Sequence, residues 1–256
     1  MQIDLFKIGP LTVHGYGAMI ALGIFISYLI VMHETKVKGY DENHVFNIVI
    51  ISIITGILGS KIFYVLLNIK ELIKDPVSVI GSEGFVVYGG IIIGTLCGYL
   101  YCRMKNLDFM RHASLILSVV PLCQCFGRIG CFMAGCCYGK ETSSSLCVVF
   151  PENSMAPAGV PLIPTQLISS LGNFIIFCIV FNIFKTCKYE KYTVPIYLCL
   201  YSIGRFLIEF LRGDEGRGWV MGLSTSQFIS IFILIAGIVL YIRVRAEHDR
   251  ESRKKL

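Results

Sequence analysis

The sequence predicts an all-α polytopic membrane protein with seven transmembrane helices. Of its 256 residues, 55% are hydrophobic and only 16% are charged, whereas soluble domains carry about 25% charged residues. The mean hydropathy is +0.70, and the hydrophobic residues fall into long runs. Because a helix needs about 20 such residues to cross the hydrocarbon core of a bilayer, composition and run length together argue against a soluble protein.

Seven hydrophobic runs supply the predicted helices. In chain order, they cover residues 15–33, 46–67, 85–103, 113–134, 165–184, 194–211 and 222–243. The segment MQIDLFKIGPLTV before the first run has no basic region leading straight into an apolar core, so we expect no cleaved signal peptide. We predict one membrane domain over residues 1–243 and a basic cytoplasmic tail over residues 244–256.

The distribution of lysine and arginine predicts which side of the membrane each loop faces. An odd number of spans places the termini on opposite sides, and cytoplasmic loops carry an excess of these two residues. With the N-terminus outside, the inner side receives the tail RVRAEHDRESRKK and most of the basic loop residues. We therefore predict an N-out, C-in topology. The longest loop, about 135–164, is then extracytoplasmic, and its four prolines favour irregular structure.

The net charge of +6 does not indicate a nucleic-acid-binding protein. Much of this charge follows directly after the last hydrophobic run. Basic segments next to a membrane helix are attracted to anionic lipid headgroups. We therefore expect membrane lipids, and no nucleic acid, among the partners.

Four charged residues stand out within the predicted spans, namely Lys61, Arg128, Arg205 and Glu209. A charge near the centre of a membrane helix costs roughly 2.5–3.5 kcal/mol, and such residues usually face a cavity or a partner. In GRFLIEFLR, helical spacing puts Arg205, Glu209 and Arg212 on one face. One interpretation is a salt-bridged stripe that neutralises itself. Lys61 could likewise extend to the membrane interface or pair with Glu209.

The other interpretation of these charges is an anion site. Two arginines and one glutamate leave a positive surplus, to which Arg128 and Lys61 add. The abundant anion in a bilayer is lipid phosphate, and a guanidinium group can bind phosphate through two parallel hydrogen bonds. The charged residues therefore predict a site for a phospholipid headgroup.

Three cysteines lie close together in GRIGCFMAGCCYG. Cys131, Cys136 and Cys137 could supply thiolates to a metal ion, but zinc sites typically combine a cysteine pair with a second pair or with histidines, and the sequence shows no such second pair. We therefore predict no metal and no cofactor, and we interpret Cys136 and Cys137 as packing or local shape. A disulfide that involves Cys136, Cys137 or Cys147 stays open if the outer face is oxidising.

A series of motifs carries a family resemblance over nearly the whole chain. In order, these motifs are HGYGAMIALG, GSKIFYVL, VVYGGIIIG, GRIGCFMAGCCYG, APAGVPLIPTQL, YSIGRFLIEFLR and MGLSTSQFIS. In these motifs and their order, the chain resembles the prolipoprotein diacylglyceryl transferases of bacteria. The combination of GRIGCFMAGCCYG with GRFLIEFLR is specific, whereas any single motif is a weak signal.

The resemblance implies a multi-pass enzyme of the bacterial cytoplasmic (inner) membrane. Members of this family move the diacylglyceryl group of phosphatidylglycerol onto the thiol of the lipobox cysteine and release glycerol phosphate. This reaction is the first step of lipoprotein maturation. The implied partners are phosphatidylglycerol and prolipoprotein signal peptides with a lipobox cysteine. The family fold, seven helices with N-out, C-in topology, agrees with the orientation predicted from the charges.

The resemblance also assigns candidate site residues. Arg128 matches the signature arginine of the family, and we expect it to hold the lipid phosphate together with Arg205, because charge grows on that phosphate in the transition state. Tyr88 is a candidate for a direct chemical role and Glu209 for orienting the arginines. The candidate residues for binding phosphatidylglycerol are Arg128, Arg205, Arg212, Lys61, Tyr16, Tyr201, Gly135 and Gly139. The tyrosines could instead be interfacial or space-filling side chains.

Several positions depart from the family pattern. Tyr88 stands where some members carry histidine. The signature has Cys131 and Ala134 in place of asparagines and Cys136 in place of glutamate, and the outer-loop motif is altered at Ile163, Ile168 and Ser169. These departures keep two alternatives open: a divergent paralogue with a different acceptor, and a non-enzymatic membrane protein that binds lipid or another anion.

Overall fold

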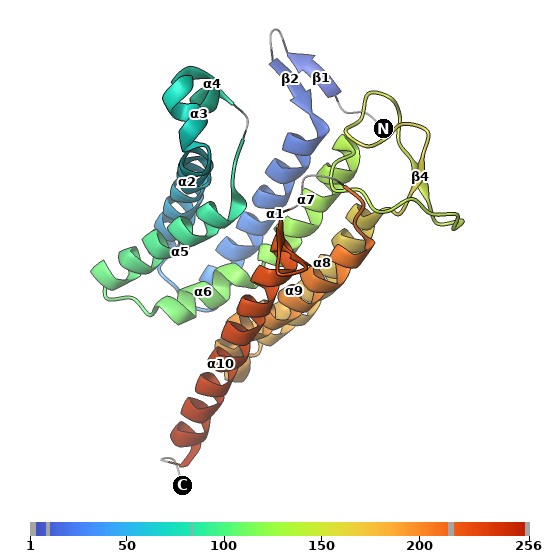
Figure 1. Cartoon of the computed structure of the whole chain (residues 1–256). Coiled ribbons are helices and arrows are strands. Elements are labelled where there is room, and N and C mark those ends of the chain that lie inside the picture. The colour runs from blue at the N-terminus through green and yellow to red at the C-terminus, as the bar shows by residue number, and fades with distance from the viewer. Residues whose placement is uncertain (1–3, 9–10, 83, 215–217, 254–256) are drawn as a thin grey trace. The chain divides into compact units, whose positions relative to one another are not determined.

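The computed structural model describes residues 4–8, 11–82, 84–214 and 218–253, which are mainly helical (Figure 1). The chain divides into two compact units, one formed by Met1–Val31 with Ala113–Leu256 and the other by Met32–His112. The end of the predicted tail, residues 254–256, lies outside the described residues. The prediction of a single membrane domain over residues 1–243 stays a prediction.

The unit Met32–His112 is built from helices. Its complete helices are α2 (Glu42–Leu67), α3 (Ile69–Lys74), α4 (Pro76–Gly81) and α5 (Val87–Met104). It also contains the end of α1 (Gly15–Val37) and the start of α6 (Phe109–Leu117).

Close packing of α2 against α5 holds this unit together. The side chain of Asp41 accepts a hydrogen bond from the backbone N–H of His44 at 2.9 Å and so caps the start of α2. At Gly94 of α5, an added Cβ would lie 2.9 Å from the backbone oxygen of Ser52. Glycine is therefore required there, because the two helix backbones approach each other without a side chain between them.

The larger unit contains the remaining helices and three small antiparallel pairs of strands. The strands β1 (Asp4–Ile8) and β2 (Leu11–His14) form a hairpin ahead of α1. The rest, in chain order, are α7 (Val120–Ala134), β3 (Val148–Val149), β4 (Pro161–Leu162), α8 (Thr165–Lys185), the 3₁₀ turn η1 (Cys187–Tyr192), α9 (Thr193–Ile208), the 3₁₀ turn η2 (Glu209–Leu211), β5 (Trp219–Val220), β6 (Leu223–Ser224) and α10 (Thr225–Arg253).

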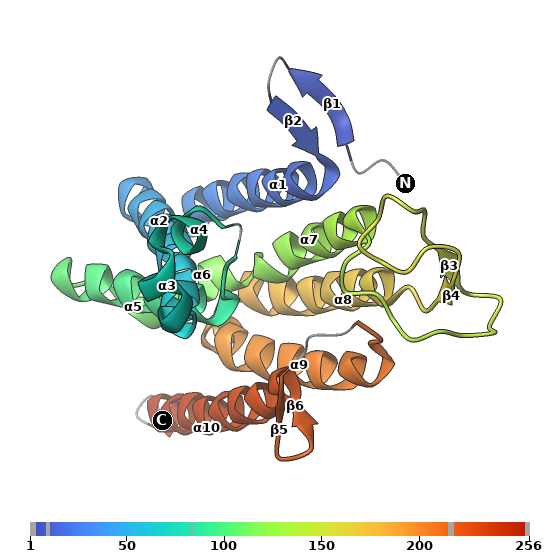
Figure 2. The same ribbon diagram turned by 45° about the horizontal axis from the view of Figure 1, so that its top comes forward.

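The neighbouring helices of this unit pack in chain order. Helix α7 lies against α8, α8 against α9, and α9 against α10, as Figure 2 shows. The first part of α1 lies against α7, since an added Cβ on Gly23 would come within 2.8 Å of the Cβ of Phe126. This arrangement brings the signature segment on α7 and the GRFLIEFLR segment on α9 to either side of α8.

The predicted span over residues 113–134 is divided into α6 and α7. Pro121 lies in the first turn of α7 and has no backbone N–H, so it cannot continue the hydrogen bonds of the preceding helix. Gly135, with φ of +75°, ends α7 in the left-handed conformation that glycine adopts readily.

Among the described residues, six helical segments are long and apolar enough to cross a membrane. They are Gly15–Val37, Glu42–Leu67, Phe109–Ala134, Thr165–Lys185, Glu190–Leu211 and Thr225–Arg250. These segments confirm a helical, multi-pass membrane protein. The predicted span 85–103 corresponds to α5, which is not one of the six and whose 18 residues include four glycines and Arg103. The count of seven and the N-out, C-in orientation therefore stay predictions.

The loop over residues 135–164 was expected to be irregular, and its regular structure consists of the short strands β3 and β4. Three buried side chains, Phe150, Ala156 and Leu162, form a small core inside it. Phe132 of α7 packs on this core, so the loop is anchored to the helix that carries Arg128.

Candidate active site

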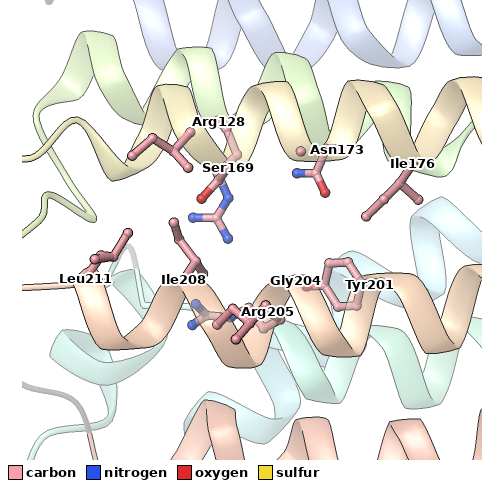
Figure 3. A pocket seen from close by; sticks show the side chains of 12 residues that line it. Arg128, Ser169, Asn173, Ile176, Tyr201, Gly204, Arg205, Ile208 and Leu211 are labelled. Carbon is pink, nitrogen blue, oxygen red and sulfur yellow. The ribbon is translucent and has the colours of Figure 1, made fainter. Parts of the chain in front are cut away.

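Residues of α7, α8 and α9 line a cavity of about 260 Å³ in the larger unit (Figure 3). Its walls are mostly aliphatic. Its polar lining residues are Arg128 of α7, Ser169 and Asn173 of α8, and Tyr201 and Arg205 of α9. The cavity therefore brings together three of the predicted site residues, Arg128, Tyr201 and Arg205.

Arg128 is half-buried, and its guanidinium points into the space between α8 and α9 (Figure 3). Within the described parts of the chain, no carboxylate pairs with Arg128 and no group accepts a hydrogen bond from its guanidinium. A cation in a mostly apolar cavity is costly unless it is paired. Arg128 is therefore suited to bind an anion that enters the cavity.

Arg205 differs from Arg128 because its guanidinium is already engaged. Its Nη1 lies 2.7 Å from Oε2 of Glu209, and its Nη2 donates a hydrogen bond to Oγ of Ser226 on α10 at 2.7 Å. These two partners hold the side chain beside α9. Arg205 lines the cavity and adds its charge there, but its guanidinium is already paired with Glu209 and Ser226.

Glu209 connects Arg205 to Arg212, as the salt-bridged interpretation of the stripe predicts. The Glu209 side chain is only 2% exposed, and its Oε2 lies 3.8 Å from Nη1 of Arg212. Arg212 also donates two hydrogen bonds to the carboxylate of Asp214, one of them from Nε to Oδ1 at 2.9 Å. Asp214 supplies a second carboxylate, which offsets the positive surplus among Arg205, Glu209 and Arg212.

The stripe is not a continuous helix. Helix α9 ends at Ile208, the chain tightens into the 3₁₀ turn η2, and Arg212 is extended. Arg212 still meets Glu209 because the tighter turn brings residues three apart onto one side. Burial lowers the pKa of Arg212, but the hydrogen bond to Asp214 and the negative charges of Cys137, Asp214 and Glu209 together raise the pKa above its ordinary value.

Backbone pairing joins the end of the signature to the segment after α9. Gly139 forms a β-bridge with Arg212, and the N–H of Gly213 donates to the carbonyl of Tyr138 at 3.1 Å. An added Cβ on Gly139 would lie 2.5 Å from the carbonyl oxygen of Ile163. Gly139 is therefore required for this close backbone contact. Its predicted approach to a lipid headgroup stays a prediction, as does that of Gly135.

The three signature cysteines gather at the end of α7. The Sγ atoms of Cys131, Cys136 and Cys137 all lie within 4.8 Å of one another, and each residue is half-buried. Gly135 and Cys137 both have positive φ, which turns the chain back toward Cys131. Hydrogen bonds from Cys131 and Cys136, together with the charges of Arg212 and Arg128, lower the pKa of the Cys137 thiol.

The two predicted tyrosines of this unit lie near the arginines. Tyr201 lines the cavity, and its ring stacks on Tyr197 with centroids 5.8 Å apart. Tyr16, at the start of α1, is 44% exposed and interacts electrostatically with Arg128 and the cysteines. Their roles in binding lipid stay predictions.

Lys61 and Tyr88 belong to the other unit, Met32–His112. The Nζ of Lys61 donates hydrogen bonds to the carbonyl oxygens of Ser82 at 2.6 Å and of Val79 at 3.3 Å, and it lies 5.1 Å from the ring centroid of Tyr64. Tyr88 is half-buried in the first turn of α5. The roles assigned to Lys61 and Tyr88, including the pairing of Lys61 with Glu209, stay predictions.

Sequence reasoning missed three polar residues around these arginines. Asp214 could have been found, because it follows Arg212 by two residues and carries the opposite charge. Asn173 and Ser226 come from α8 and α10, and no local pattern connects them to Arg128 or Arg205.

Comparison with known proteins gives one consistent result. The family model described as prolipoprotein diacylglyceryl transferase matches residues 4–243. A phosphatidylglycerol–prolipoprotein diacylglyceryl transferase of Clostridium tetani is 44% identical over 94% of this chain and 97% of its own length. The protein numbered 2 under that name in Clostridium perfringens is 45% identical over 100% of both chains. A relative with the same name in Clostridioides difficile is 34% identical over 93% of both chains.

Proposed function

Because the chain belongs to the prolipoprotein diacylglyceryl transferase family, we propose that it transfers the diacylglyceryl group of phosphatidylglycerol to a cysteine thiol of a prolipoprotein. The sulfur attacks the glycerol carbon that bears the phosphate. The carbon–oxygen bond breaks, glycerol phosphate leaves with the electron pair, and the proton of the thiol passes to solvent or to the released phosphate. The acceptor is the lipobox cysteine, and the reaction is the first step of lipoprotein maturation.

The single observation that carries the assignment of the site is the guanidinium of Arg128 in the cavity, which has no carboxylate partner among the residues that the structure describes. Negative charge develops on the departing phosphate as the carbon–oxygen bond breaks. A fixed cation stabilises that charge more in the transition state than in the bound lipid, and this difference accelerates the reaction. Arg128 therefore binds the phosphate, and Arg205 contributes positive potential from the opposite wall.

The size of the cavity supports headgroup binding. At about 260 Å³, it is smaller than the roughly 300–1,000 Å³ of sites for drug-sized ligands. A phosphoglycerol headgroup suits this volume, and the two acyl chains remain along the apolar helix surfaces. Ser169 and Asn173 on α8 are placed to hydrogen-bond the glycerol hydroxyls.

Glu209, Arg212 and Asp214 act as positioning residues. Glu209 holds Arg205 at 2.7 Å, and Arg212 holds Glu209 from the other side. A buried carboxylate between two guanidinium groups stays ionised and is a poor base. The proton of the acceptor thiol therefore leaves by another route.

The proposed setting is the bacterial cytoplasmic membrane, with the N-terminus outside and the C-terminus inside. In this arrangement α5 is the seventh span, and the cysteine-containing end of α7 faces outward. Alkylation of single introduced cysteines in intact cells would test it. If cysteines in the loop over residues 135–164 were labelled only after the cells are broken, the proposed orientation would be contradicted.

The deciding experiment incubates the purified protein with phosphatidylglycerol and a lipobox peptide. Mass spectrometry should find the diacylglyceryl thioether and released glycerol phosphate, and Arg128→Ala should abolish both. Arg243→Ala is the matched control, because Arg243 is an exposed arginine of α10 and does not line the cavity. Bound lipid without release of glycerol phosphate would instead show a non-enzymatic lipid-binding protein.

A further inference from the structure

We propose that Cys131, Cys136 and Cys137 form a binding site for one thiophilic d¹⁰ metal ion, such as Zn²⁺, Cd²⁺ or Cu⁺. Three sulfurs from two turns of chain converge at the end of α7, with every Sγ within 4.8 Å of the other two. On binding, three thiols release their protons to solvent and three metal–sulfur bonds form. No oxidant or reductant is needed.

The distances suit one shared ion. A zinc–sulfur bond is about 2.3 Å long, so two sulfurs on one ion lie roughly 4 Å apart. Small rotations about the side-chain bonds bring sulfurs within 4.8 Å to that separation. Three protein ligands leave one position open for water or another exogenous ligand, as in zinc sites that are not purely structural.

The backbone around the cysteines is already fixed. The side chain of Gln166 donates to the carbonyl of Cys136 at 2.8 Å, and Oγ1 of Thr165 donates to the carbonyl of Cys137 at 2.8 Å. Gln166 and Thr165 are only 1% and 2% exposed. The chain therefore loses little conformational entropy when the thiolates take up an ion, because the bend that brings the thiols together is held by buried side chains of α8.

The surrounding charge also suits a thiolate complex. Three thiolates with a divalent ion carry a net charge of −1, which is costly in a half-buried position unless cations are near. Arg128 and Arg212 both interact electrostatically with Cys137. The guanidinium groups that would repel a bare metal ion thus compensate the charge of the completed complex.

Metal binding has a consequence for the proposed function, on which this second step rests. Cys131 follows Arg128 by one helical turn, and an anionic complex beside Arg128 would compete with lipid phosphate for the guanidinium. Occupancy of the cysteine site should therefore inhibit diacylglyceryl transfer.

The test titrates the reduced, purified full-length protein with Cd²⁺ and counts bound ions by native mass spectrometry, with the ultraviolet thiolate-to-metal absorption as a second readout. One Cd²⁺ should bind per chain. Replacement of Cys131, Cys136 or Cys137 by serine should weaken binding at least about 10-fold, because loss of a direct ligand should cost no less than loss of an outer-shell partner. Cys147→Ser, a change to a half-buried loop cysteine outside the cluster, is the control and should bind as the wild type does.

A measurement on the unaltered protein keeps the test valid if a serine variant fails to fold. Cd²⁺ should protect these three cysteines from alkylation, with peptide mapping as the readout, and should leave exposed Cys178 reactive. Equal alkylation with and without Cd²⁺ would overturn the site, and so would a disulfide among the three that forms under reducing conditions. These readouts do not depend on catalysis, so absence of the thioether product would count against the proposed function alone.

The inhibitory step has its own outcome. In the transfer assay, stoichiometric Cd²⁺ should lower the rate of thioether formation at least about 10-fold, in line with the occupancy, and a chelator should restore it. An unchanged rate with the ion bound would overturn the inhibition and leave the metal site standing.

Discussion

Helix α7 and the end of α9 carry arginines in opposite situations. Arg128 on α7 faces the cavity, and the described residues provide it with neither a carboxylate nor a hydrogen-bond acceptor. Arg205 and Arg212, at and beyond the end of α9, are tied to Glu209, Asp214 and Ser226. The contrast separates two uses of a buried charge. Paired arginines fix the wall of a site, whereas an unpaired one keeps its capacity to bind an anionic ligand.

The strongest way to break the comparison is Arg128→Ala. If Arg128 binds the departing phosphate, its loss should lower kcat by about 10³-fold or more, the scale seen for arginines that stabilise transferred phosphoryl groups. Thermal unfolding should change little, because none of the described residues forms an ion pair or a hydrogen bond with the Arg128 guanidinium. Rates from the thioether assay and melting curves in detergent would check both parts. A large loss of stability with normal turnover would reverse the roles assigned to α7 and α9.

Glu209→Ala should have the next largest effect, and on stability. It leaves Arg205 without its 2.7 Å partner in a site where the Glu209 side chain is 2% exposed. Removal of one member of a buried ion pair costs about 3–5 kcal/mol. Denaturant titration of the detergent-solubilised protein would measure the loss. A cost no greater than that of Glu247→Ala, a change at an exposed position on α10, would contradict the pairing.

Asp214→Asn should destabilise less, because Arg212 keeps its contact with Glu209. Hydrogen bonds to a charged group contribute about 1.5–3 kcal/mol, and Asparagine at position 214 would retain one acceptor oxygen. We therefore expect a cost at or below the lower end of this range. A double-mutant cycle with Arg212→Met would measure the coupling, and additive effects would show that the two side chains act independently.

Ser226→Ala should have the smallest effect. It removes one acceptor, at 2.7 Å from Nη2 of Arg205, and a neutral partner contributes about 0.5–1.5 kcal/mol. The variant also tests the contrast between the two arginines, because it removes a hydrogen-bond acceptor from Arg205 and so leaves its guanidinium less engaged, as that of Arg128 is. We expect the KM for phosphatidylglycerol to change by less than about 10-fold, the factor that corresponds to 1.4 kcal/mol. A larger change in KM would place Ser226 in direct contact with lipid.

The sequence predicted those parts of the fold and site that depend on neighbouring residues. Long apolar runs identified the helices, and the spacing of Arg205 and Glu209 placed both on one face, where an ion pair was one of two interpretations. The break at Ser118 and Val119 was missed, although Pro121 signals it, because the apolar run continues through it.

Features that depend on packing between distant segments could not be predicted. Ser226 contacts Arg205 only because α10 packs on α9. Gly139 pairs with Arg212 only because the segments that follow α7 and α9 lie side by side. That Arg128 has no carboxylate partner among the described residues is likewise a property of its surroundings. Cys131 is separated in sequence from Cys136 and Cys137, and only the left-handed turn after α7 brings the three sulfurs together.

The β-bridge between Gly139 and Arg212 joins two segments that are distant in the sequence. The segment that follows α7 is held to the segment that follows α9, close to the edge of the cavity that Leu211 lines. Two helices that are joined at one end can move apart only toward their other ends. Any widening of the gap between α7 and α9 is therefore smallest at the edge of the cavity next to this bridge.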